Sequence, residues 1–268
     1  MNCFFFRNIA VMVKPKKHLG QHFLTDQRIA GKTALLAARS QVSEVLEIGP
    51  GKGILTTHLL KLEGKKILAI ELDNESIDFL QSNKILQKPD LIEGDFLKLN
   101  IADFFKNEFI LIGNYPYNIS SQIIFKMLEN RILIPFMAGM FQKEVAVRIA
   151  SKSGNKEYGI LSVLTQAFYD VKIEFSISPG AFFPPPKVDS AVISCQRKTE
   201  IDLGCSEKLF FDVVKTAFNQ RRKTLLNSLN KFNLRETFVT HAFAKLRPET
   251  LSVNQFIELT RFIESNRK

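Results

Sequence analysis

Short apolar runs alternate with stretches of helical spacing along about the first 200 residues of the chain. Each run ends near Gly, Asp or Asn, as strands buried in a parallel sheet do. Strands that alternate with helices are joined by right-handed crossovers, so this pattern predicts an α/β fold with a doubly wound sheet. We expect strands over 45–48, 67–71, 91–94, 109–113, 136–141, 171–177 and 188–197, and helices over 54–62, 75–83, 120–130, 143–151 and 159–169.

The pattern changes after Thr199. Only helical spacing follows, over 207–218, 223–229 and 253–263. This part of the chain is also basic, with 12 Lys or Arg residues against 8 Asp or Glu residues. We therefore expect an α/β domain over 14–198 and a small, all-helical domain over 199–268.

The chain as a whole carries a large positive charge. Its 37 Lys and Arg residues exceed the 27 Asp and Glu residues, which gives a net charge of +10 at pH 7. An excess of this size indicates a polyanionic partner, either a nucleic acid or an acidic membrane surface. No apolar run approaches the roughly 20 residues that a membrane-spanning helix needs, so we expect no membrane-bound form.

Cysteine and histidine usage excludes two further classes. The cysteines, Cys3, Cys195 and Cys205, are too few and too scattered for a disulfide framework, and no metal-ligand spacing is present. We therefore expect a cytoplasmic protein without a metal site. Residues 1–13 lack the features of a signal peptide, and we expect them to be disordered or a mis-assigned start, with Met12 as the initiator.

A glycine-rich loop over 47–53 follows the first strand and opens a helix. Gly53 lies only two residues beyond Gly51, so the loop departs from the dinucleotide fingerprint G-x-G-x-x-G. It is not a P-loop either. Glu71 ends the second strand, where a carboxylate can accept hydrogen bonds from ribose hydroxyls, and Asp95 follows the third, where it can accept from an adenine amino group. Together these residues predict a site for a nucleoside cofactor without a diphosphate, and S-adenosylmethionine fits.

The segment 114–120, Asn-Tyr-Pro-Tyr-Asn-Ile-Ser, ends the fourth strand. The exocyclic amine of adenine is a poor nucleophile because its lone pair is delocalised into the ring. We expect the side-chain oxygen of Asn114 and the carbonyl of Pro116 to accept the two amino hydrogens and so direct the lone pair toward a methyl group. Tyr117 offers a face on which an extruded base can stack. This segment predicts methylation at N6 of adenine.

Six collinear motifs together resemble the bacterial small-subunit ribosomal RNA adenine N6,N6-dimethyltransferase family, whose product confers kasugamycin sensitivity. They are 17–24, 47–53, 70–73, 114–120, 182–192 and 218–224, and the resemblance covers about residues 14 to 265. It implies a Rossmann-like S-adenosylmethionine-dependent methyltransferase sheet with a helical C-terminal domain. It also implies two methylations on each of two adjacent adenosines in the 3′-terminal hairpin of 16S rRNA, in the 30S subunit or its precursor. We expect a monomer.

The resemblance also assigns residues to the site. It places His22 and Leu24 at the mouth of the cofactor site and Gly49 and Gly51 against the methionine part of the cofactor. It places Glu71 on the ribose and Asp95 on the adenine. Asn114 belongs to the catalytic turn and also contacts the cofactor. Two positions depart from the family pattern, since position 22 is often Asn and position 115 is often Leu. The departure at position 22 leaves the role of the His22 side chain open.

Two further groups of residues are candidates for RNA contact. Phe182 precedes a triple proline, and the resemblance suggests that its ring stacks on the flipped adenine. Arg221, Arg222 and Lys223 are consecutive cations on the basic helical domain, and we expect them to contact phosphate.

Three other functions compete with this one. A related 23S rRNA adenine methyltransferase shares the glycine loop and the catalytic turn, whereas the motifs at 182–192 and 218–224 favour the small-subunit enzyme. A non-catalytic ribosome-assembly factor is disfavoured by intact residues at Glu71, Asp95 and Asn114. A DNA adenine methyltransferase usually carries additional target-recognition sequence, for which 199–268 leaves little room.

Overall fold

A seven-stranded sheet forms the centre of the computed structural model, which describes residues 13–267 apart from the side chain of Arg235. The strand order is β4-β3-β2-β5-β6-β9-β7. All neighbours up to β6 are parallel, and β9 is antiparallel to both β6 and β7. The strands are β2 (Glu44–Ile48), β3 (Lys66–Glu71), β4 (Leu91–Glu93), β5 (Phe109–Asn114), β6 (Phe136–Gln142), β7 (Tyr169–Ile177) and β9 (Ser190–Arg197). The predicted α/β class and its strands are confirmed.

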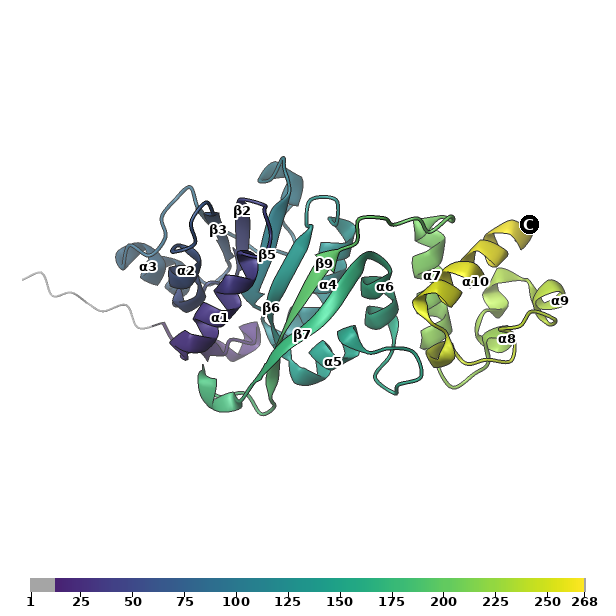
Figure 1. Cartoon of the computed structure of the whole chain (residues 1–268). Coiled ribbons are helices and arrows are strands. Elements are labelled where there is room, and N and C mark those ends of the chain that lie inside the picture. Colours follow the sequence, from purple (N-terminus) through teal and green to yellow (C-terminus); the bar gives the residue numbers. More distant parts are fainter. Residues whose placement is uncertain (1–12, 268) are drawn as a thin grey trace, which may run out of the picture.

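The apolar strand runs supply both faces of the sheet, because successive side chains point in opposite directions. Leu46 belongs to one hydrophobic cluster and its neighbour Val45 to another. Helices α1 (Gln27–Ala37), α2 (Ile54–Leu59) and α3 (Asn74–Ser82) cover the face of Val45, whereas α4 (Ser120–Glu129), α5 (Lys143–Ala150) and α6 (Ile160–Phe168) cover the other. Figure 1 shows α1 in front of the sheet and α4 behind it.

Two elements near the N-terminus were not expected. Helix α1 begins after Asp26, whose carboxylate accepts hydrogen bonds from the backbone N–H groups of Arg28 (2.9 Å) and Ile29 (3.2 Å). The short strand β1 (Phe23–Leu24) pairs antiparallel with β8 (Phe182–Phe183). This pairing joins the N-terminal segment to the proline-rich motif, which is far away in the sequence.

Only helices follow β9, and they lie at the opposite end of the molecule from the N-terminal segment (Figure 1). They are α7 (Glu207–Asn219), α8 (Leu225–Ser228), α9 (Arg235–Phe238) and α10 (Val253–Asn266). Both α7 and α10 pack on α6, and one hydrophobic cluster runs from Leu46 of β2 to Ile263 of α10. Short 3-10 helices span Lys17–Leu19, Ile101–Asp103, Tyr117–Ile119, Pro179–Ala181, Asn230–Phe232 and Pro248–Thr250.

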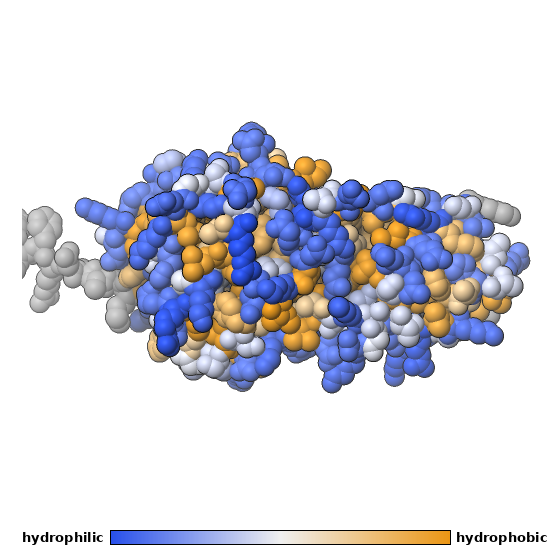
Figure 2. All heavy atoms as spheres, viewed as in Figure 1, coloured by the Kyte–Doolittle hydropathy of each residue, from blue (hydrophilic) through white to orange (hydrophobic). Residues whose placement is uncertain are grey.

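Hydrophilic side chains cover most of the face seen in Figure 2, and apolar residues gather there only in small groups. Among the described residues, no helix is both long and apolar enough to cross a membrane. Within the same residues, no group of three or more His, Cys, Asp or Glu side chains is arranged to hold a metal ion. The prediction about the start of the chain falls on residues 1–12, outside the described residues, whereas Val13 is buried.

Candidate active site

A cavity opens at the carboxyl ends of β2, β3, β4 and β5, the edge at which open α/β sheets bind their ligands. The N-terminal segment closes one side of it. The lining residues are Leu19, Gly20, Gln21, His22, Phe23, Ile48, Gly49, Gly51, Ile70, Glu71, Leu72, Gly94, Asp95, Phe96, Leu97, Asn114, Tyr115, Pro116, Tyr117, Asn118 and Ile119. None of these residues is a lysine or an arginine.

Glu71 links the glycine loop to the end of β3. Its Oε2 accepts a hydrogen bond from the N–H of Gly51 (3.0 Å), and its Oε1 accepts from the N–H groups of Leu72 and Asp73 (both 2.9 Å). The side chain is buried, which raises the pKa of Glu71, while the three N–H donors act in the opposite direction. Gly51 has a φ of +55°, and a Cβ there would lie 2.9 Å from the ring of Phe23, so only glycine fits.

Asp95 lies across the cavity, just beyond β4. Its Oδ1 accepts a hydrogen bond from the N–H of Leu97 (3.0 Å), which fixes the carboxylate at the start of a turn. Apolar side chains line the space between the two carboxylates: Ile70 and Leu72 from β3 and the residue that follows it, and Phe96 and Leu97 from the turn. This part of the cavity therefore combines an apolar lining with two carboxylates.

Asn114 ends β5 at the same edge. Its Nδ2 donates a hydrogen bond to the backbone oxygen of His22 (2.8 Å), so its Oδ1 is the atom available as an acceptor. The next ring, Tyr115, is fully buried and donates its hydroxyl to the carbonyl of Ala138 (2.9 Å). Gly113 and Gly139 make room for it, since a Cβ at either position would lie within 3.0 Å of the ring.

Tyr117 is held on two sides. Its ring stacks on that of His22 with centroids 5.3 Å apart, and its hydroxyl bonds to Oγ of Ser190. The Nδ1 of His22 in turn donates to the carbonyl of Pro184 (2.7 Å). The β1–β8 pairing therefore orients His22, and through it one face of Tyr117.

A sequence profile of the family described as ribosomal RNA adenine dimethylase matches residues 12–264. The chain belongs to this family. The ribosomal RNA small subunit methyltransferase A of Flavobacterium johnsoniae is 53% identical over 255 residues, which cover 95% of this chain and 97% of that protein. The protein of the same name from Cytophaga hutchinsonii is 49% identical and covers 94% of this chain and 98% of its own length. The resemblance found in the sequence is confirmed.

Solved structures agree with this rRNA adenine dimethylase assignment. A dimethyladenosine transferase from Plasmodium falciparum superposes with a TM-score of 0.75 at 27% identity, covering 91% of this chain and 98% of that one. The 23S rRNA methyltransferase ErmE superposes with a TM-score of 0.63 over 88% of this chain and 98% of that one. At 24% identity, the second comparison shows the fold alone.

Two expectations about this dimethylase site need correction. The side chains of Leu24 and Phe182 are only 5% and 3% exposed, because they pair across β1 and β8 and pack together in the core. Neither lines the cavity, and Phe183 is the exposed ring of the pair at 58%. The carbonyl of Pro116 accepts from the N–H of Ile119 (3.2 Å), whereas the single hydroxyl hydrogen of Ser120 lies between this carbonyl (3.3 Å) and that of Tyr117 (3.1 Å).

The three consecutive cations Arg221, Arg222 and Lys223 do not all have the same surroundings. They lie in the turn between α7 and α8 rather than on a helix. Arg221 donates to the carbonyl of Asn155 (3.3 Å), and its Nε lies 3.8 Å from a carboxylate oxygen of Glu249. Arg222 and Lys223 are exposed, and neither side chain forms an ion pair within the described part of the chain. Arg221 therefore joins the C-terminal helices to the loop after α5, whereas its two neighbours face solvent.

Sequence reasoning missed four residues around the site. Lys16, Gln21 and Asp73 bond to one another beside the cavity, and Ser190 holds Tyr117. A signal was present, since three of the four lie inside the motifs 17–24, 70–73 and 182–192. Their partners are distant in sequence, so the motifs alone did not show what these side chains contact.

Glu47 of β2 is a buried carboxyl group beneath the glycine loop. It is 1% exposed, and within residues 13–267 its Oε2 has no hydrogen-bond partner. Burial raises its pKa to about 8, and the nearby Glu71 carboxylate adds to the effect. Glu47 is therefore largely protonated at neutral pH in the folded chain.

We expect Glu47→Gln to stabilise the protein increasingly as pH rises from 5 to 8. Between an ordinary value of 4.5 and about 8, the folded chain keeps a proton that the unfolded chain releases. Stability of the wild type therefore falls with rising pH, by at most about 1.4 kcal/mol per pH unit, and Gln removes this titration. Urea unfolding at pH 5, 6.5 and 8 measures the difference. Glu44→Gln, on the same strand but partly exposed, is the control, and a pH-independent difference for Glu47→Gln would contradict the assignment.

Proposed function

We propose that this chain transfers methyl groups from S-adenosylmethionine to N6 of two adjacent adenosines in the 3′-terminal hairpin of 16S rRNA, dimethylating each. The substrate is the 30S subunit or its precursor in the cytoplasm. One observation supports this chemistry most directly. The side-chain nitrogen of Asn114 donates a hydrogen bond to the backbone oxygen of His22, so its side-chain oxygen remains available as an acceptor in the cavity. The small-subunit assignment rests on the relatives that share about half of their residues with this chain.

The cavity suits S-adenosylmethionine. Glu71 and Asp95 are acceptors for the ribose hydroxyls and the adenine amino group, and the apolar side chains that line the same cavity suit the purine. A Cβ at Gly49 would meet nothing within 4 Å, which leaves space there for the methionine part, whereas Gly51 lets the ring of Phe23 pack against the loop. The glycine spacing departs from the one that binds a diphosphate at a helix N-terminus, which disfavours a dinucleotide. When bound, the cofactor supplies an electrophilic methyl group on a sulfonium.

Two acceptors raise the reactivity of the target amine. Oδ1 of Asn114 accepts one amino hydrogen. The carbonyl of Pro116 already accepts from the N–H of Ile119, so we assign the second acceptor to the preceding carbonyl, that of Tyr115, which receives no hydrogen bond from any described residue. No strong base is required, because the N6 proton becomes acidic only after the methyl group has been added.

Tyr117 holds the extruded base. One face of its ring lies against His22, so the other is left for the adenine, and stacking of a base on an aromatic ring contributes about 1–3 kcal/mol. Burial raises the pKa of Tyr117, so its hydroxyl stays protonated and can bond to Ser190. Tyr117 therefore acts through its ring.

We expect the joint replacement Arg222→Gln and Lys223→Gln to weaken binding to 30S subunits, most strongly at low salt. Each phosphate contact adds about 0.7–0.9 to the slope of log affinity against log salt, so the slope falls by roughly one to two units. Arg221→Gln is the matched variant, and it lowers the melting temperature while leaving the slope unchanged, because Arg221 contacts Asn155 and Glu249. An unchanged slope in the double variant would remove both residues from the RNA contact.

Methyl transfer from labelled S-adenosylmethionine to unmodified 30S subunits tests the function itself. We expect label in 30S subunits, at N6 of the two adenosines, and none in 50S subunits or duplex DNA. Label in 50S subunits instead would support the 23S rRNA reaction. Binding to 30S subunits without label would support a non-catalytic assembly factor.

A further inference from the structure

Residues 16–22, which we call the strap, form one wall of the cofactor cavity although they belong to no long helix or strand. Leu19, Gly20, Gln21 and His22 of the strap all line the cavity. Their position depends on contacts with segments that lie far away in the sequence. The strap is anchored at both of its ends.

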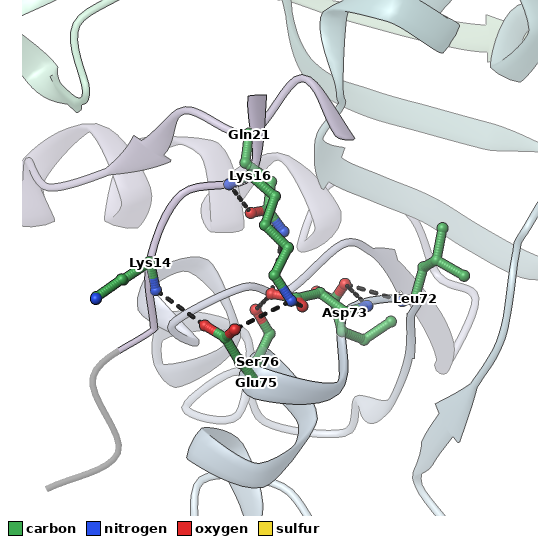
Figure 3. Close-up of polar contacts among 8 residues, drawn as sticks. Lys14, Lys16, Gln21, Leu72, Asp73, Glu75 and Ser76 are labelled. Carbon is green, nitrogen blue, oxygen red and sulfur yellow. Dashed lines mark hydrogen bonds and ion pairs between the residues drawn. The ribbon is translucent and has the colours of Figure 1, made fainter. Parts of the chain in front are cut away.

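One end is held by a buried carboxylate. Asp73 lies two residues beyond Glu71, and its side chain is fully buried. Its Oδ1 receives the ammonium of Lys16, and its Oδ2 accepts from Nε2 of Gln21 (3.3 Å). The N–H of Lys16 in turn donates to Oε1 of Gln21 (2.8 Å), so the three residues form a closed ring of contacts (Figure 3).

The surroundings keep this carboxylate charged. Burial alone would raise the pKa of Asp73, but bonds from Lys16, Ser76 and Gln21 outweigh it and lower the pKa. Glu75 lies 3.3 Å from the same lysine ammonium and adds a second negative charge. Charge-assisted hydrogen bonds of this kind are stronger than neutral ones, and a buried ionised group is costly to leave without its partner.

The other end of the strap meets the catalytic turn. Asn114 donates to the backbone oxygen of His22 (2.8 Å), and Asn118 donates to that of His18 (3.5 Å). Gly20 has a φ of +64°, and a Cβ there would lie 2.6 Å from the side chain of Asn118. The strap therefore contacts both Asp73, beyond the end of β3, and the turn that begins at Asn114.

We propose that Lys16, Gln21 and Asp73 form a clamp that holds the strap closed over bound cofactor and thereby sets its dissociation rate. This inference rests on the proposed binding of S-adenosylmethionine. Asp73 is a positioning residue that acts on both walls, because its N–H holds Glu71 and its carboxylate holds the strap. No residue of the clamp takes part in the methyl transfer itself.

Lys16→Met tests the clamp. We expect the Kd for S-adenosylmethionine to rise about tenfold through faster dissociation, with kcat at saturating cofactor within twofold of the wild type. The melting temperature without cofactor falls, because the buried Asp73 carboxylate loses its charged partner, and hydrogen exchange of the 16–22 amides becomes faster. Lys16→Arg keeps the charge and restores the affinity. Lys17→Met, an exposed neighbouring lysine, is the matched control and changes none of these quantities.

A second variant tests the coupling. Asp73→Asn reproduces the loss of affinity, and the double variant Lys16→Met with Asp73→Asn is no weaker than the worse single variant, because both changes remove the same contact between Lys16 and Asp73. Ser76 donates to the same carboxylate from α3 (2.9 Å) without touching the strap, so Ser76→Ala controls for damage to that helix. Additive losses, or equal affinities for Lys16→Met and Lys17→Met, would overturn the proposal.

These outcomes are separable from failure of the proposed function. If the wild type does not bind S-adenosylmethionine, the proposed function is wrong, and hydrogen exchange still decides whether the clamp holds the strap. If the wild type binds and exchange over 16–22 is unchanged in Lys16→Met, the clamp is wrong and the function stands.

Discussion

Asn114→Ala is expected to reduce methyl transfer to 30S subunits about 100-fold or more in single-turnover assays. Removing one preorganised hydrogen-bonding group that acts mainly at the transition state typically costs a factor of about 100–1,000. The affinity for 30S subunits changes little, because the oxygen of Asn114 contributes most when the amine attacks the methyl group. Rates measured with saturating enzyme and cofactor isolate this step from binding.

The control for this variant is Tyr115→Phe. It removes a buried hydroxyl at the adjacent position, which bonds to the carbonyl of Ala138 and not to the cavity. We expect a lower melting temperature and near-normal turnover. Because Asn114 also anchors His22, cofactor affinity is measured in parallel. Normal single-turnover rates in Asn114→Ala would contradict the activation of N6 by this side chain.

Glu71→Ala should weaken S-adenosylmethionine binding about 10- to 150-fold in calorimetric titrations without RNA. The ribose loses a charge-assisted acceptor worth about 1.5–3 kcal/mol. The glycine loop also loses the bond from the N–H of Gly51 that orders it before binding.

A matched control comes from the neighbouring strand. Glu93 pairs in register with Glu71 but is exposed and does not line the cavity. We expect Glu93→Ala to bind cofactor as the wild type does. If Glu71→Ala and Glu93→Ala bind equally well, Glu71 does not belong to the cofactor site.

Local sequence predicted the strands of the sheet but did not predict helix α1. The difference lies in how strong an apolar pattern each element leaves in the sequence. The strands are continuous apolar runs, because both faces of the sheet are covered, and such runs stand out in any sequence. The buried face of α1 consists largely of alanines such as Ala30, Ala34 and Ala37, which give a weak apolar signal. The available signal was the cap at Asp26, whose side chain accepts from the first turn.

For the candidate site, too, some features follow from the sequence and others only from the tertiary structure. The sequence by itself determined the fold class and predicted the ligand-binding edge of the sheet and the roles of Glu71, Asp95, Asn114 and Tyr117, because these residues lie at strand ends or just beyond them. Residues at the carboxyl ends of parallel strands must meet at one edge, whatever the packing around them.

Only the tertiary structure decided which of two adjacent groups faces the site. Neighbouring strand residues point to opposite sides, so the β1–β8 register alone buries Phe182 and exposes Phe183. The turn after Pro116 occupies its carbonyl and leaves that of Tyr115. Asp73 has the local sequence of a helix start, yet its partners Lys16 and Gln21 lie more than 50 residues earlier. Contacts over such separations depend on how the chain folds back on itself, which no local pattern records.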